Sequence, residues 1–152
     1  MTARAGSFPA LHLSSFVPFR LNRLAAAVSE HLSGIYRERF GLEIPEWRVM
    51  ATVGPVRGCT AQYIAGSTRM HKTRVSRAIA QLVKRSLIER AARPGDRREI
   101  ELRLTRTGRR MYSQLVPLAL ERERALLACL CDAQRQAFTQ ALELLEDFLG
   151  LA

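Results

Sequence analysis

The spacing of apolar residues between Met70 and Arg85 predicts an amphipathic helix. Apolar side chains recur there at intervals that place them on one helical face; they are Met70, Val75, Ile79, Leu82 and Val83. Most other positions are cationic or carry hydroxyl groups; they are Lys72, Thr73, Arg74, Ser76, Arg77 and Lys84. The segment therefore has one face suited to a protein core and another suited to a polar partner.

A different pattern follows and predicts a β-hairpin. Two short strands are expected, at residues 87–93 and 99–105. In the second strand apolar residues alternate with charged ones, as in a half-buried strand; these are Ile100, Leu102 and Leu104. The connection contains Pro-Gly-Asp, which favours a turn. We therefore expect Arg97 and Arg98 to project beyond the sheet at the hairpin tip.

Helical patterns account for most of the remaining chain. The other expected helices span about residues 15–40, 44–54, 60–66, 105–131 and 132–149. Gly41 and Gly54 are natural helix ends, while Thr60 and Asp132 are expected N-caps. The hairpin and the helices together predict a mainly α fold with a small β-hairpin.

The first and last helices carry more apolar surface than a small domain can bury. The last helix has a continuous row of apolar side chains along one face, which includes Leu142, Leu145 and Phe148. A two-fold dimer would bury this apolar surface, because each copy presents the same surface to the other. We expect an N-terminal arm and helix 1 at residues 1–45, a binding domain at 46–108 and dimerisation helices at 109–152.

The charge is concentrated on the central segment. The net charge is +10, and residues 57–110 contain 15 Lys/Arg and 4 Asp/Glu, a local net charge of +11. The rest of the chain holds 9 basic and 10 acidic residues. A concentrated excess of this kind favours a face that binds a polyanion, above all nucleic acid.

Several other classes of function have little support. Three cysteines do not make a secreted disulfide framework, and the sequence has no targeting segment and no membrane span. The three histidines are scattered without other ligands at metal-binding spacing. No catalytic motif is recognised. We therefore expect a cytoplasmic protein with no membrane partner, no metal, no cofactor and no enzymatic activity.

Four short motifs resemble a known family. They are Val75-Ser-Arg-Ala-Ile79, Leu87-Ile-Glu-Arg90, Asp96-Arg-Arg98 and Leu104-Thr-Arg-Thr-Gly108. They are similar to the core of the MarR family of bacterial transcriptional regulators, over about residues 60–110. The resemblance implies a winged helix-turn-helix dimer that binds an operator in double-stranded DNA. At two positions where the family usually has glycine, this chain has Arg69 and Ser86, where a positive φ is then expected to cost some energy.

The resemblance and the charge pattern together select candidate DNA-binding residues. They are Thr60, Lys72, Thr73, Arg74, Ser76, Arg77, Arg97 and Arg98. Side chains of these types donate to phosphates or to guanine, and the sequence does not sort one role from the other. Arginines at a hairpin tip suit the narrow, negative minor groove of A·T-rich DNA.

In the family, ligands commonly bind where helix 1, helix 2 and the long helix after the hairpin meet. The corresponding candidates here are Ser15, Arg20, Arg23, Trp47 and Arg48. An aromatic wall beside a guanidinium suits an aromatic carboxylate or its CoA thioester. We therefore expect a repressor that a small effector of this kind releases from a near-palindromic operator. The alternative is that Trp47 belongs to the core and that the arginines form surface or dimer salt bridges.

Two other functions stay open. A redox-responsive regulator could act through Cys59, whose pKa the nearby Arg57 is expected to lower, or through an intermolecular bridge of Cys129 or Cys131. The last two are expected on one helix, pointing away from each other. The other possibility is an architectural protein that binds DNA regardless of its sequence.

Overall fold

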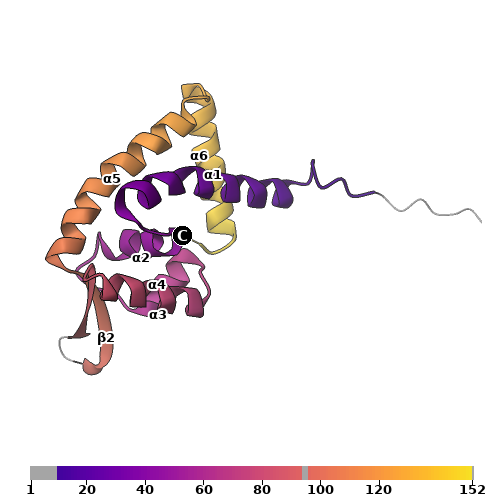
Figure 1. The fold of residues 1–152 in the computed structure, drawn as a ribbon. Helices are drawn as coiled ribbons and strands as arrows, with labels where there is room; N and C mark the ends of the chain where they lie inside the picture. Colours follow the sequence, from indigo (N-terminus) through magenta and orange to yellow (C-terminus); the bar gives the residue numbers. More distant parts are fainter. Residues whose placement is uncertain (1–9, 94–95, 152) are drawn as a thin grey trace, which may run out of the picture.

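Six helices and one hairpin make up the part of the chain that the computed structural model describes, residues 10–93 and 96–151 (Figure 1). In chain order they are α1 (Val17–Phe40), α2 (Ile44–Val53), α3 (Ala61–Thr68), α4 (Lys72–Lys84), β1 (Ile88–Arg93), β2 (Asp96–Leu104), α5 (Arg106–Leu127) and α6 (Asp132–Phe148). All the expected helices are present, with ends close to those predicted. Residues 1–9 of the expected N-terminal arm lie outside the described residues.

Local sequence signals explain where the first helices begin and end. A proline occupies the first turn of α1, where its missing N–H costs nothing. Gly41 ends α1 in the left-handed conformation, with φ 59°. Glu43 and Glu46 form a capping box at the start of α2, each side chain bonding the other's backbone N–H.

The hydrophobic core lies among α2, α3, α4 and the base of the hairpin. Its fully buried side chains come from all of these elements and from α5; they include Leu42, Val49, Met50, Ile64, Leu82 and Leu115. Three apolar residues expected on the inner face of α4, Val75, Ile79 and Leu82, are buried. The core therefore holds α4 with its other face exposed.

The strands pair antiparallel from Ile88 opposite Leu104 to Ala92 opposite Ile100, and the register then shifts so that Arg93 faces Asp96. The shift marks a β-bulge or a similar irregularity between Ala92 and Arg93.

Two sequence-based expectations about the hairpin are therefore wrong. Arg97 and Arg98 lie within β2 and not beyond the sheet, because the strands pair as far as Arg93 opposite Asp96. Ile100 is 55% exposed, whereas Leu102 and Leu104 are buried as expected.

Two residues other than glycine have a positive φ, among the residues described. They are Arg69 (φ 54°), at the end of α3, and Ser86 (φ 55°), after α4. Both occupy positions at which the sequence predicted this conformation, so the expectation is confirmed. A side chain in this region costs on the order of 1 kcal/mol relative to glycine, which the surrounding packing offsets.

Helix α5 leads away from the hairpin, and α6 folds back from its far end (Figure 1). No residue of α6 is buried. Large apolar side chains are exposed on it and on the N-terminal half of α1; they include Phe16, Val17, Leu24, Leu144, Leu145, Phe148 and Leu149. Neither α6 nor any other described helix is both long and apolar enough to cross a membrane.

Candidate nucleic-acid interface

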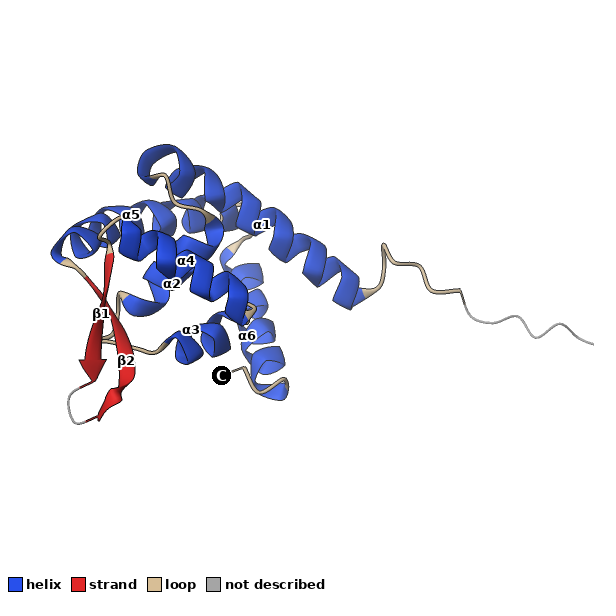
Figure 2. Ribbon diagram, turned by 60° about the horizontal axis from the view of Figure 1, so that its bottom comes forward, coloured by secondary structure: helices blue, strands red, loops and turns tan. Residues whose placement is uncertain are grey.

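Helix α4 presents its cationic face to solvent. Five of the candidate DNA-binding side chains lie on it and are all exposed; they are Lys72, Thr73, Arg74, Ser76 and Arg77. His71 caps the helix, with its Nδ1 accepting the backbone N–H of Thr73 at 3.3 Å. The hairpin extends beside α3 and α4 (Figure 2), and residues of all three line one hollow.

The start of α3 adds residues that the sequence analysis missed. Thr60 caps α3, and its Oγ1 accepts the backbone N–H of Tyr63 at 3.1 Å; this capping role was predicted. Gln62 and Tyr63 are exposed on the first turn of α3. Their position directly after the expected cap was a signal that could have identified them as surface residues near α4.

A hollow of about 410 Å³ lies between α3, α4 and the hairpin. Its lining combines apolar side chains with two cations and includes Val75, Ile100, Lys72 and Arg90. Arg90 and Ile100 were not among the candidate residues, because their side-chain directions depend on the hairpin register. The face therefore offers apolar contacts, which can meet thymine methyl groups, beside its charges.

A set of hydrogen bonds joins α4, the hairpin and α5. The Thr105 hydroxyl caps α5 by accepting the backbone N–H of Gly108 at 3.0 Å, and it donates to the carbonyl oxygen of Ser86 at 2.6 Å. A Cβ atom at Gly108 would overlap the carbonyl oxygen of Leu87. The Leu-Thr-Arg-Thr-Gly motif therefore closes a tight junction between the end of the hairpin and the start of α5.

The arrangement is that of a winged helix-turn-helix protein, in which α4 is the recognition helix and the β1–β2 hairpin is the wing. The model of the MarR family matches residues 40–99. A MarR family transcriptional regulator from Silicibacter pomeroyi DSS-3 is 30% identical, with a TM-score of 0.80, over 92% of this chain and 99% of that chain. The chain belongs to the MarR family. It is therefore a transcriptional regulator and not an enzyme, and the predicted family and fold class are confirmed.

Two further solved structures are similar. A MarR/EmrR family regulator from Acinetobacter sp. ADP1 is 25% identical, with a TM-score of 0.83, over 93% of this chain and 100% of that chain. BpsR from Bordetella bronchiseptica, whose DNA binding is regulated by 6-hydroxynicotinic acid, is 22% identical, with a TM-score of 0.80, over 91% and 99% of the two chains. The second likeness shows the fold alone. No curated protein sequence matches the chain.

The expected ligand residues of this MarR family member lie in two places. Trp47 stacks on Tyr36, with ring centroids 5.5 Å apart, and on Tyr112, at 6.5 Å. Burial raises the pKa of Tyr36, and the positive charge of Arg48 acts against this shift. Arg48 also donates to Ser29 Oγ at 3.3 Å. These contacts place a guanidinium beside an aromatic stack.

The other candidates lie on the N-terminal half of α1. Arg20 and Arg23 line an open hollow of about 600 Å³ along that helix, together with Ser14. Trp47 and Arg48 do not line this hollow, and neither does Ser15, which donates its hydroxyl to the His12 carbonyl at 3.0 Å. A single protomer therefore does not bring the five candidate residues into one pocket.

The cysteines differ from expectation in two ways. Cys59 is buried, and burial together with the charge of Glu101 raises its thiol pKa. The prediction that Arg57 lowers this pKa is wrong, because the groups that lie near the thiol in space, and not its neighbours in the sequence, set the pKa. Cys129 and Cys131 are exposed and lie in the connection between α5 and α6, so the argument that one helix separates them does not hold. Cys131, and not Asp132, is the N-cap of α6.

Proposed function

We propose that this protein is a dimeric, sequence-specific repressor that a small ligand releases from a near-palindromic operator. The observation that carries the proposal is the face of α4, whose exposed Lys, Arg, Ser and Thr side chains lie beside the wing. A helix of this composition fits the major groove, and an adjacent hairpin can follow the phosphate backbone. A regulator of this kind acts where the chromosome lies, and we propose that the protein is cytoplasmic.

Exposed apolar surface supports the dimer. Phe148 is 85% exposed and Leu145 is 44% exposed, and Leu142 is partly buried on the same helix. A second copy that covered α1 and α6 would remove this surface from water. The proposed division is unchanged: residues 1–45 and 109–152 assemble the dimer, and residues 46–108 bind DNA.

We propose an aromatic carboxylate, or its CoA thioester, as the effector. The Tyr36–Trp47–Tyr112 stack offers an aromatic surface, and Arg48 offers a charge for a carboxylate beside it. Regulation of BpsR by an aromatic acid supports this ligand class. Arg20 and Arg23 would contribute where the second protomer closes the hollow along α1.

The DNA-binding proposal is tested with duplexes that the purified protein selects from a random pool. A specific regulator should enrich a two-half-site sequence and bind it about 10³-fold or more tightly than unrelated DNA. Enrichment of no sequence, with equal affinity for all duplexes, would indicate the architectural alternative.

The ligand proposal is tested on the same operator. Trp47 is the only tryptophan, so its fluorescence reports occupancy directly while a panel of aromatic acids and their CoA thioesters is titrated. Arg48→Ala and Arg23→Ala should raise the ligand concentration needed for release without changing DNA affinity, whereas Arg39→Ala, an exposed position on α1, should change neither. If no compound alters fluorescence or operator binding, the ligand proposal fails and DNA binding stands.

The redox alternative is now confined to the exposed pair, Cys129 and Cys131. Buried Cys59 has a raised thiol pKa, so it offers little thiolate for oxidation. Operator binding that peroxide abolishes and dithiothreitol restores in wild type, but not in a variant with both exposed cysteines replaced by serine, would establish this alternative.

A further inference from the structure

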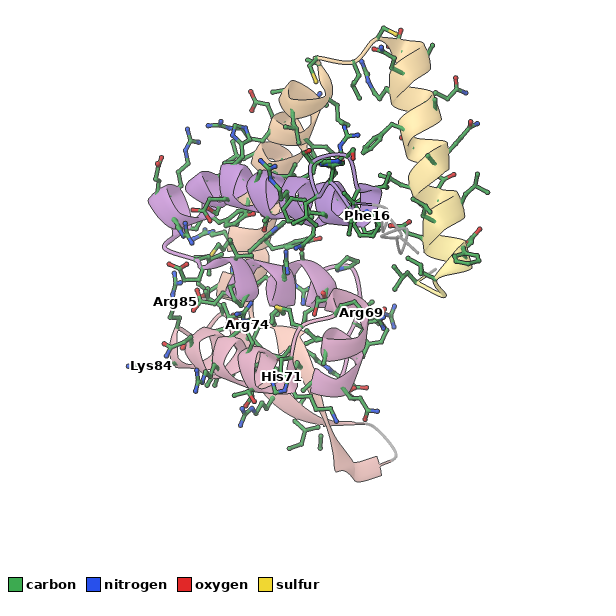
Figure 3. All side chains as sticks on the ribbon, turned by 90° about the vertical axis from the view of Figure 1, so that its right-hand side faces the viewer. Phe16, Arg69, His71, Arg74, Lys84 and Arg85 are labelled. Atoms are coloured by element: carbon green, nitrogen blue, oxygen red, sulfur yellow. The ribbon has the colours of Figure 1, made fainter. Side chains whose placement is uncertain are left out.

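Arg85 connects the recognition helix to the end of α1. It follows α4 directly, and its guanidinium donates to two backbone carbonyl oxygens, Phe40 O at 2.7 Å and Gly41 O at 2.8 Å. Figure 3 shows Arg85 at the opposite end of α4 from His71, on the side where the α1 ribbon ends. In the sequence, Arg85 lies 44 residues after Gly41 and 45 residues after Phe40.

The carbonyl groups that Arg85 contacts have no helical partner of their own. Where α1 ends, the N–H of Gly41 bonds to Arg37 O at 3.0 Å and the N–H of Leu42 bonds to Tyr36 O at 2.8 Å. The carbonyl oxygens of Phe40 and Gly41 lie beyond these bonds, at the negative end of the α1 dipole. A guanidinium suits this position because it carries a positive charge and can donate two hydrogen bonds at once.

A buried carboxylate adds a third partner. Arg85 Nη1 lies 3.9 Å from Glu46 Oε2, and the Glu46 side chain is only 12% exposed. The same oxygen accepts the backbone N–H of Glu43 at 2.9 Å. Because a buried carboxylate needs a compensating charge, Arg85 also stabilises the cap of α2.

The polar contacts continue along α1. Arg37 Nε donates to Glu43 Oε2 at 3.0 Å, and its Nη1 donates to Glu30 Oε1 at 2.7 Å and to Ser33 Oγ at 3.1 Å. A connected series of charged groups therefore runs from the middle of α1 to the end of the recognition helix. Apart from this series, α1 and α4 each pack mainly against other elements.

We propose that Arg85 is a positioning residue that sets the orientation of the recognition helix relative to α1. The inference rests on the proposed function, in which α1 belongs to the dimer and two recognition helices bind two half-sites. In such a dimer, the angle between α1 and α4 determines the distance between the two recognition helices. Arg85 then determines which half-site spacing the dimer accepts, through its contacts to the end of α1 and to Glu46.

The test measures spacing preference in the full-length protein. Duplexes are made from the operator that the wild type selects, with one or two base pairs added to or removed from the centre. Each added base pair shifts one half-site by about 3.4 Å and rotates it by about a tenth of a helical turn. The variants are Arg85→Gln, which removes the charge, and Arg85→Lys, which keeps the charge but cannot bond two carbonyl oxygens in the same way.

Lys84→Gln is the matched control, since Lys84 is the adjacent exposed cation. It removes one positive charge near the same end of α4 without touching the contacts to α1. Any loss of general attraction to DNA should therefore appear in this control as well.

We expect the wild type and Lys84→Gln to bind altered spacings at least about tenfold more weakly than the selected spacing. In Arg85→Gln this penalty should shrink to about threefold or less. The affinity of this variant for the selected operator should fall by about three- to tenfold, because hydrogen bonds from a partly exposed charge contribute only modestly to stability. Arg85→Lys should lie between.

A full wild-type penalty in both Arg85 variants would overturn the proposal, and so would an equal loss at every spacing. If Arg85→Gln proves unfolded by circular dichroism, Arg85→Lys decides alone. Failure of the wild type itself to select two half-sites would count against the proposed dimeric regulator and not against the contact with α1.

Discussion

Truncation of Phe148 to alanine should dissociate the proposed dimer. Phe148 ends α6 and is 85% exposed in the single protomer. Full burial of a phenylalanine side chain contributes about 1.5–3 kcal/mol. Scaled by the exposed fraction and counted in both protomers, the loss is about 2.5–5 kcal/mol, which raises the dimer dissociation constant between about a hundredfold and a few thousandfold.

Sedimentation velocity over a range of protein concentrations measures this constant. Val56→Ala is the matched control, because Val56 is an exposed apolar residue in the connector between α2 and α3. It should leave the dimer unchanged. Operator affinity should fall in Phe148→Ala at concentrations where the dimer dissociates, and recover at higher concentration. A wild type that is monomeric at micromolar concentration, or an unchanged constant in Phe148→Ala, would refute the reasoning.

Three further predictions concern DNA binding and stability. The double substitution Arg97→Ala/Arg98→Ala should weaken specific and nonspecific binding alike and make the salt dependence shallower by about 1 to 2 units, as filter binding over a salt series would show; unchanged slopes would contradict a wing contact. Arg74→Ala and Arg77→Ala should have different effects on DNA binding. Loss of a guanine contact costs about 1–3 kcal/mol at one base pair, whereas loss of a phosphate contact lowers the affinity for all sequences. A uniform loss of affinity in both variants would mean that other residues read the bases. Gly108→Ala should destabilise the fold by about 1–3 kcal/mol in urea titrations, since its Cβ overlaps the carbonyl oxygen of Leu87; a wild-type midpoint would mean that the junction relaxes freely.

The sequence predicted those features that local periodicity determines. The buried face of α4 was visible because Val75, Ile79 and Leu82 recur at helical spacing. The positive φ of Arg69 and Ser86 was visible because the surrounding motifs show where the family turns its chain. In both cases the information lies within a few residues of the feature itself.

Features that depend on strand register were not predictable in the same way. Ile100 fits the alternation of β2 and pairs in register with Ala92, yet it is 55% exposed, whereas Leu102 and Leu104, nearer the base of the hairpin, are buried. β2 also extends further toward the turn than the alternation indicates, and it includes Arg97 and Arg98. The register depends on how the hairpin closes, so a pattern of alternating residues gives the strand but not the end of its pairing.

Contacts between distant segments limited the prediction of the ligand site. Trp47 lies in an aromatic stack with Tyr36 and Tyr112, and sequence spacing does not reveal these two partners. The thiol of Cys59 shows the same limit, since Glu101 influences it more than its sequence neighbour Arg57. A side chain's chemistry is readable from sequence only where its neighbours in space are also its neighbours along the chain.

The hydrogen bonds that join the recognition helix to distant segments lie at its C-terminal end. At the C-terminal end, Arg85 bonds the end of α1 and the carbonyl of Ser86 accepts from Thr105 at the start of α5. At the N-terminal end, the cap from His71 is local to α4 itself. A 13-residue helix is about 20 Å long, so a tilt of about 10° around the held end moves the other end by about 3.5 Å, the rise of one base pair. In the proposed dimer, a small rearrangement of α1 or α5 would therefore be sufficient to change which half-site spacing fits.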